Sequence, residues 1–429
     1  MKVIVCCLSL LCCSLFSHAS SVKSVSYQKL KNGISVVFID TGTVDSVLIM
    51  MSVSAGSADE IESHGVANLL CEMISNRLKQ QVNFNKLQYG VEVGSYTGYD
   101  QTVYYLYGKP ENLNKYIKYF SDAICNFSCD EKMLQESKKA VYQKIKDDEK
   151  INKFDVQKSA LSSLYWHAGY GYPITGESND AELAHISSLN EFHKNNYKNN
   201  KITFFIVGRI NQENTSELLQ KTFSKNAGIA KINRLKEPEH HGSSVQIEKA
   251  SEQIDTVMLN FYWKITPYSM NKTEALADEI LVEYIENVLQ KQLVNDLKII
   301  SAISSSHVSW NREHGHCYFS VTAPANADLD FIKTSVVASM KCLVSDGIEN
   351  SEKVSQIKKK IINSANIYNM DAIDATDWIS KRISAGYEWD FLMNFAKIGD
   401  KCDINLINKE AKKIFCKDPD VISIIKPKE

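Results

Sequence analysis

The chain has 429 residues, which is more than one hydrophobic core usually serves, so we expect at least two domains. Its 49 Lys and Arg residues nearly balance its 51 Asp and Glu residues. This balance excludes a strongly basic chain, and nucleic acid is therefore not an expected partner.

The chain begins with the features of a secretory signal. One basic residue precedes an apolar run that extends to Phe16, and small residues surround Ala19. Such a run is too short to span a bilayer and is typical of a cleaved signal peptide. We expect residues 1–20 to be removed near Ala19, with no transmembrane segment left after cleavage. Lipid attachment at Cys12 or Cys13 stays open as an alternative.

The cysteines argue against a disulfide framework. Four of the eleven lie in the predicted signal, and the remaining set is odd in number and widely scattered. We therefore expect buried free thiols. The remaining cysteines are Cys71, Cys125, Cys129, Cys317, Cys342, Cys402 and Cys416.

The first half of the mature chain predicts alternating strands and helices. Asn32-Gly33 is a hairpin signal between two extended runs. Apolar residues from Val66 to Ile74 recur with the period of a buried helix. The predicted elements are strands within 27–39, a strand 47–53, a helix that begins near Val66, a β-ribbon within 89–106, and helices 110–126 and 130–148.

The second half repeats this order of elements after a polar, turn-forming interval at 236–244, which has the composition of a linker. We expect a strand 256–262, a helix 272–291, strands 300–310 and 317–322, and helices 330–344 and 351–370. Long helices on one face of a mixed, mostly antiparallel sheet define an α+β fold. We predict one such domain over 24–235 and another over 245–429.

The stretch from Ala55 to Arg77 carries the most specific pattern. Gly56-Ser57 with Glu60, followed by Gly65-Val66-Ala67 and Met73, resembles the frame of the pitrilysin/insulinase family of zinc peptidases. Similar frames over 170–177, 186–197 and 202–208 extend the resemblance over nearly all of the mature chain. It implies two homologous α/β-roll halves that close like a clam shell around a chamber.

The family's inverted zinc motif is His-x-x-Glu-His, in which two histidines on one helical face hold zinc and the glutamate acts as general base. Here the three positions are held by Asn68, Cys71 and Glu72. An amide is a poor ligand and no base at neutral pH. Where the family has a further zinc-binding Glu on the helix over 130–148, this chain has Gln143 or, shifted by one residue, Lys144.

These replacements predict that the chain has no catalytic residues and binds no metal, with Cys71 and Glu72 as weak metal candidates. The family's Arg and Tyr that hold substrate from the C-terminal half are replaced by Val294 and Ser301. We interpret the short motif His314-Gly315-His316-Cys317 as a surface turn rather than a metal clip.

The resemblance also implies a peptide-binding strand edge at Ser95, Tyr96 and Thr97, because extended substrates pair with this strand in the family. A plain internal hairpin is the alternative. With the signal sequence, the resemblance implies an exported, catalytically inactive family member, in the bacterial periplasm, that serves as the peptide-binding subunit of a heteromer with a catalytically intact homologue. An active peptidase with an unorthodox metal site and a stand-alone peptide-binding or scaffold protein remain alternatives.

Overall fold

The computed structural model describes residues 21–61, 63–84, 90–149, 152–166, 168–230, 234, 244–252 and 254–428. The predicted signal peptide and residues 236–243 of the predicted linker lie outside the described residues. Within the described ranges, no helix combines the length and the apolar character needed to cross a bilayer.

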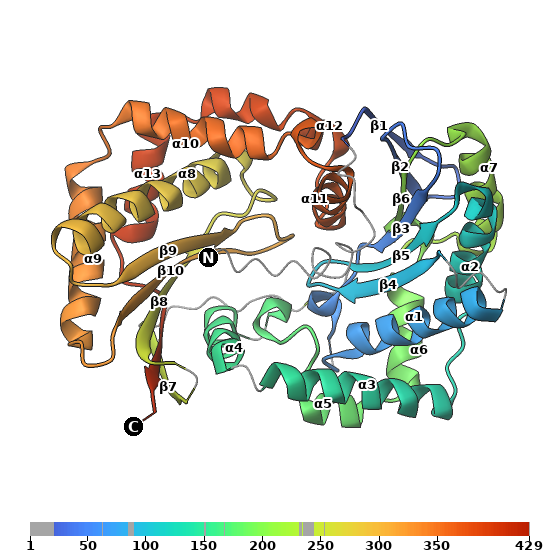
Figure 1. The fold of residues 1–429 in the computed structure, drawn as a ribbon, viewed down its shortest axis with the longest axis horizontal. Helices are drawn as coiled ribbons and strands as arrows, with labels where there is room; N and C mark the ends of the chain where they lie inside the picture. The colour runs from blue at the N-terminus through green and yellow to red at the C-terminus, as the bar shows by residue number, and fades with distance from the viewer. Residues whose placement is uncertain are drawn as a thin grey trace. The chain divides into compact units, whose positions relative to one another are not determined.

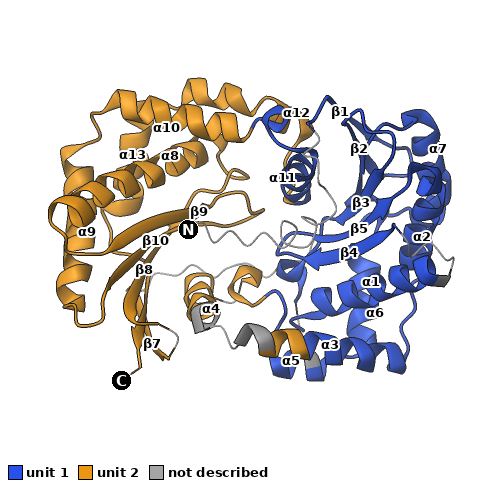
Figure 2. Cartoon of the chain, viewed as in Figure 1, with its two compact units in different colours: residues 1–142, 174–233, 366–384 blue, residues 143–173, 234–365, 385–429 orange. Residues whose placement is uncertain are grey.

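The chain forms two compact units, and each unit takes a segment from the other half of the chain (Figure 2). Unit 1 comprises residues 1–142, 174–233 and 366–384, and unit 2 comprises residues 143–173, 234–365 and 385–429. The segment 366–384 thus joins the N-terminal unit, and the segment 143–173 joins the C-terminal one. The predicted domains, 24–235 and 245–429, do not account for these two exchanges.

Unit 1 is built on a six-stranded mixed sheet with the order β1-β2-β6-β3-β5-β4. β2 and β6 are parallel, and the other neighbours are antiparallel. The strands are β1 (Ser24–Lys29), β2 (Ser35–Asp40), β3 (Val47–Val53), β4 (Glu92–Thr97), β5 (Thr102–Gly108) and β6 (Ile202–Val207).

Helices cover both faces of this sheet at its centre, since every residue of β3 and β6 is buried. Ser52 of β3 lies 2.9 Å from Ser384 of α11, measured between the two hydroxyl oxygens, so α11 covers one face. Its neighbour Met51 is paired with Tyr104 and faces the opposite side, where α1 lies. The helices of unit 1 are α1 (Val66–Phe84), α2 (Leu113–Cys125), α5 (Ser178–Leu183), α6 (Ile186–Asn196), α7 (Gln212–Thr222) and α11 (Ala372–Ser384), and α3 (Glu131–Glu149) passes from unit 1 to unit 2 (Figure 1).

Unit 2 has a five-stranded sheet with the order β7-β11-β8-β10-β9, in which only β11 and β7 are parallel. Trp263 on β8 stacks edge-on against Phe319 on β10 and Phe415 on α13, which fixes the core on the α13 face. The strands are β7 (Val245–Ser251), β8 (Thr256–Ile265), β9 (Ala302–Val308), β10 (Gly315–Pro324) and β11 (Val421–Pro427). The helices are α4 (Asn152–Leu164), α8 (Lys272–Leu289), α9 (Leu329–Asp346), α10 (Ser351–Ser364), α12 (Trp389–Met393) and α13 (Ile404–Phe415).

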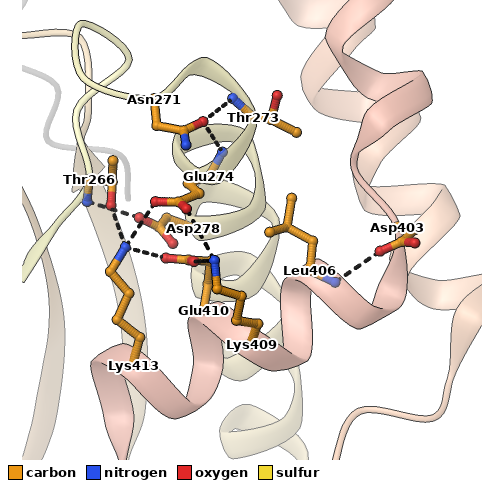
Figure 3. Close-up of polar contacts among 10 residues, drawn as sticks. All are labelled: Thr266, Asn271, Thr273, Glu274, Asp278, Asp403, Leu406, Lys409, Glu410 and Lys413. Atoms are coloured by element: carbon orange, nitrogen blue, oxygen red, sulfur yellow. Dashed lines mark hydrogen bonds and ion pairs between the residues drawn. The ribbon is translucent and has the colours of Figure 1, made fainter.

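A group of charged side chains joins α13 to α8 and to the end of β8 (Figure 3). Lys413 Nζ lies 3.0 Å from Glu274 Oε2 and 2.7 Å from Glu410 Oε2, and Lys409 Nζ lies 3.3 Å from Glu274 Oε1. The third carboxyl, Asp278, is fully buried and accepts a hydrogen bond from the Thr266 N–H at 2.9 Å. We call these three carboxyls and two ammonium groups the α8–α13 charge cluster.

The α+β class with two sheet-containing halves is confirmed, and most predicted elements occur within a few residues of their expected limits. The predicted helix 351–370 is too long, because α10 ends at Ser364 and a separate 3₁₀ turn, Ile367–Asn369, leads into α11. The surface-turn interpretation of 314–317 is wrong for 315–317, which are buried at the start of β10. His316 is buried in β10, where its Nδ1 lies 2.6 Å from the Tyr165 hydroxyl.

Candidate functional site

Glu60 defines where α1 begins. Its carboxylate accepts hydrogen bonds from the N–H groups of Gly65 at 2.9 Å and Ala67 at 2.7 Å, and so satisfies two of the donors that a helix N-terminus leaves unpaired. Burial raises the pKa of Glu60 well above its usual value. The glutamate of the family frame is therefore a structural cap in this chain.

Two glycines of the frame meet beside this cap. Gly65 has φ +78° and Gly176 has φ +71°, a region that side-chain-bearing residues rarely adopt. A Cβ on Gly65 would lie 2.8 Å from the Thr175 carbonyl oxygen, and one on Gly176 would lie 2.9 Å from the Gly65 Cα. Close backbone contacts require glycine at both positions, so the presence of these glycines gives no information about catalysis.

Cys71, at the general-base position, belongs to the core between α1 and the sheet. Its thiol and the Tyr104 hydroxyl are hydrogen-bonded, and the Tyr104 hydroxyl lies 2.8 Å from the Tyr197 hydroxyl. All three residues are buried, and burial raises the pKa values of both tyrosines. The side chain at the predicted general-base position is therefore one member of a buried chain of hydrogen bonds with Tyr104 and Tyr197.

The donors at the zinc-motif positions do not suit zinc. Asn68 is buried and offers an amide, Cys71 is engaged with Tyr104, and Glu72 accepts a hydrogen bond from the Asn76 amide at 3.0 Å. In the part of the chain that the structure describes, no three His, Cys, Asp or Glu side chains gather as a metal-binding group. We derive no catalytic step through zinc from these residues.

The other predicted positions belong to unit 2, whereas α1 belongs to unit 1. Gln143 and Lys144 are exposed on α3, just past the division between the units. Val294 and Ser301 lie in unit 2, the first within a π-helical turn, Gln290–Asp296, and the second exposed before β9.

Ser95, Tyr96 and Thr97 all lie on β4, the outermost strand of the unit 1 sheet, whose one strand neighbour among the described residues is β5. The Gly98 N–H donates to the Gln101 carbonyl at 2.7 Å, which marks a hydrogen-bonded pair at the hairpin end. Along an antiparallel strand, the N–H and C=O groups of successive residues point alternately toward the partner strand and away from it. The main-chain groups of Val93, Ser95 and Thr97 therefore point away from β5, and we call them the β4 edge.

Tyr96 has a different role from its two neighbours. Its main chain faces β5, and its hydroxyl donates to Asp377 Oδ1 of α11 at 3.1 Å and accepts from Gln101 Nε2 at 2.9 Å. Lys381 Nζ lies 2.6 Å from Asp377 Oδ2. Tyr96 thus ties β4 to a helix from the other half of the chain. Sequence reasoning missed Val93 and Asp377, because neither carries a motif signal.

Two family models match the chain. The model described as Insulinase (Peptidase family M16) matches residues 35–178, and the model described as Peptidase M16 inactive domain matches residues 186–361. Together they cover most of the chain. The chain therefore belongs to the pitrilysin/insulinase family, peptidase family M16, as the frame residues predicted.

Curated relatives from bacteria and mitochondria are similar to this chain. It is 25% identical over 228 residues to an uncharacterized zinc protease, YmxG, of Bacillus subtilis, covering 52% of this chain and 56% of the relative. It is 24% identical over 240 residues to the mitochondrial-processing peptidase subunit beta of Neurospora crassa, covering 54% and 50%. The chain thus spans about half the length of the curated relatives it matches.

Solved structures share the fold at low sequence identity. A protease from Helicobacter pylori matches with TM-score 0.79 and 16% identity over 95% of this chain and 100% of the other. A peptidase M16 inactive domain from Pseudomonas fluorescens matches with TM-score 0.76 and 14% identity over 95% and 98%. The periplasmic protease PqqL of Escherichia coli matches with TM-score 0.78 and 16% identity over 95% of this chain and 48% of PqqL.

Proposed function

We propose that this chain is a non-catalytic, peptide-binding member of peptidase family M16 that acts as a subunit beside a catalytically intact homologue. The observation that carries the proposal is the combination of an outward-facing β4 edge with an α1 helix whose Cys71 is held in the core. A subunit of this kind keeps the surface that grips substrate and leaves the chemistry to its partner.

Main-chain pairing supports the peptide-binding part of the proposal. An extended peptide added to a sheet edge is held mainly by main-chain hydrogen bonds, so this activity does not require the side chains of the zinc motif. An outermost strand also invites aggregation unless something covers or uses it. We therefore expect an extended peptide to cover the β4 edge when the protein functions.

The comparisons support a partner and a compartment. One of the similar proteins is named as a subunit of a processing peptidase, and one family model is described as an inactive domain. One of the solved structures is titled a periplasmic protease. With the predicted signal peptide, these names favour an exported subunit in the bacterial periplasm. The proposed partner carries the intact His-x-x-Glu-His motif that this chain lacks.

Co-expression with an M16 homologue from the same genome that carries the intact motif tests the proposal. The two chains should co-elute in size-exclusion chromatography, and a permanent pair should bury on the order of 2,000 Å² or more. Peptidase activity on extended peptides should need both chains, and the isolated chain should show none.

Each result has a defined meaning. Full activity of the homologue alone, without co-elution, overturns the subunit role. Peptide binding by the isolated chain would then favour a stand-alone binder. Chelator-sensitive turnover by the isolated chain that is lost on Glu72→Gln would favour the unorthodox peptidase. A Glu136→Gln variant, which changes an exposed carboxylate on α3, is the matched control for that substitution.

A further inference from the structure

In unit 2, β9 occupies the position that β4 occupies in unit 1. Each is an outermost strand, follows a long helix (α8 and α1) and forms a hairpin with the next strand (β10 and β5). An outermost strand presents unpaired N–H and C=O groups to any extended peptide. Unit 2 therefore contains a second edge at which a peptide could add.

A glutamate from α8 occupies this second edge. The Ser305 N–H, in the middle of β9, donates to Glu286 Oε2 at 2.9 Å, and the Ser305 hydroxyl donates to the same oxygen at 2.5 Å. Strand N–H groups lie in the plane of the sheet and point across to a neighbouring strand. An acceptor bound to this N–H therefore lies where the carbonyl oxygen of an added strand would lie.

A second glutamate on α8 strengthens the attachment of β9. Glu279 lies two turns before Glu286, so both side chains are on the same side of the helix. Glu279 Oε1 accepts from the Ser309 hydroxyl at 2.5 Å and lies 3.2 Å from His307 Nε2. The two glutamates of α8 therefore contact three alternate residues, namely Ser305 and His307 in β9 and Ser309 just after it.

The β4 edge has no equivalent obstruction among the described residues. Within them, no side chain hydrogen-bonds the main chain of Val93, Ser95 or Thr97, and the side-chain link from α11 reaches Tyr96 through its phenol. The two corresponding edges therefore differ in one physical respect. A carboxylate occupies the outward Ser305 N–H of β9, and within the described ranges no side chain occupies the corresponding groups of the β4 edge.

We propose that Glu286 determines which edge takes peptide, by closing β9 so that the chain binds a single extended peptide at the β4 edge. This inference rests on the proposed peptide-binding function. Glu286 acts as a built-in competitor, because its carboxylate supplies the hydrogen-bond acceptor that a second peptide would bring.

The test counts peptides bound by the full chain, using a fluorescein-labelled Lys-Ala-Thr repeat peptide in a stoichiometric titration. Ser95→Pro removes one outward N–H from β4, a change that an edge strand tolerates, and should weaken binding at least about tenfold. Glu286→Ala should raise the stoichiometry from one peptide to two. The double variant should bind one peptide, now at β9.

Two substitutions on the same helix serve as matched controls. Glu286→Gln keeps an amide oxygen that accepts the Ser305 N–H and should leave the stoichiometry at one. Glu283→Ala removes a neighbouring carboxylate of α8 that pairs with Lys360 Nζ at 2.7 Å, and it should also leave the stoichiometry at one. Glu286→Ser is a second opening variant in case Glu286→Ala does not fold.

A folded double variant that binds no peptide overturns the inference, as does a wild-type chain that binds two. Failure of the proposed function has a different signature, since the wild-type chain would then bind no peptide. In that case Glu286→Ala still decides the inference. One peptide bound at β9 supports closure by Glu286, and none overturns it.

Discussion

At the scale of single residues, the direction of each side chain on α1 decides its role. Asn68, Cys71 and Glu72 stand at the three zinc-motif positions, yet Cys71 points into the core and hydrogen-bonds Tyr104. A thiol that stabilises a buried polar chain cannot also bind and activate water without breaking that chain. The thiol at the predicted base position is thus both chemically unsuited to catalysis and held inside the core.

Zinc content tests this interpretation directly. After mild dialysis, elemental analysis of the mature chain should find far less than one zinc per chain, because an amide, an engaged thiol and a single carboxylate form a poor ligand set. About one zinc per chain that is lost on Cys71→Ser or Glu72→Gln would contradict the prediction. An intact M16 homologue treated in the same way is the positive control.

The α8–α13 charge cluster predicts a pH effect on stability. It holds three carboxyls and two ammonium groups, and Asp278 is the one of the three carboxyls that forms no ion pair with a described residue (Figure 3). Burial raises the pKa of Asp278 well above its usual value, with a further rise from Glu410. The folded state therefore binds this proton more tightly than the unfolded state does, and stability falls as pH rises from the unfolded pKa through the folded one.

Asp278→Asn should remove this loss. Its amide keeps an oxygen for the Thr266 N–H and carries no charge, so the variant should gain stability relative to wild type as pH rises from roughly 5 to 8. Urea unfolding at several pH values measures the difference. The exposed Asp346→Asn is the matched control. A pH-independent difference between wild type and Asp278→Asn would refute the assignment of the proton to Asp278.

At the scale of elements, α11 links the C-terminal half of the chain to the β4 edge through Tyr96 and Asp377. Asp374, one turn earlier on α11, has a pKa raised to about 6 by burial, by a hydrogen bond with Asp371 and by repulsion from Asp371 and Asp377. The helix that supports β4 therefore carries a crowded row of carboxyls.

Tyr96→Phe should loosen β4 without unfolding unit 1. The loss of one hydrogen bond to a charged acceptor costs about 2 kcal/mol at most, so we expect faster amide exchange over 92–97 and weaker peptide binding by roughly fivefold. Hydrogen exchange and the peptide titration measure both effects. Tyr27→Phe, on β1 at the opposite edge of the same sheet, is the control and should change neither. Unchanged amide exchange in β4 of Tyr96→Phe would show that the contact with α11 does not support the peptide-binding strand.

At the scale of the whole molecule, the two units are built by exchange between the halves of the chain (Figure 2). α11 completes the core of unit 1 from the C-terminal half, where Ser384 meets Ser52, and α4 covers β7 and β11 of unit 2 from the N-terminal half. Each half of the chain therefore lacks a helix that its own sheet requires.

Cleavage between the halves should leave a noncovalent complex. With a protease site inserted into 236–243, the cut chain should elute as one species under native conditions and separate in denaturant, because α11 and α4 bury apolar surface in the opposite units. Independent elution of two folded fragments under native conditions would show that the halves are self-sufficient. The uncut chain with the same insertion is the control.

Local sequence patterns were sufficient to predict the elements that depend only on residues near one another in the chain. The Asn32-Gly33 turn, the strand Val47–Val53, the start of α1 at Val66 and the absence of the zinc-motif side chains all follow from the sequence. Turn chemistry, hydrophobic period and side-chain inventory are properties of short segments. The α+β class followed from these local patterns, and the family followed from the resemblance of the frame residues to it.

Only the tertiary structure decided the contacts between distant segments. Cys71 of α1 meets Tyr104 of β5, which in turn meets Tyr197, His316 is buried against Tyr165, and α11 joins the unit formed mainly by the other half of the chain. The acceptor on β9 likewise comes from Glu286 on α8, a helix residue with no motif of its own. Such contacts depend on which faces of separate elements are buried together, and the period of a single segment does not encode that choice.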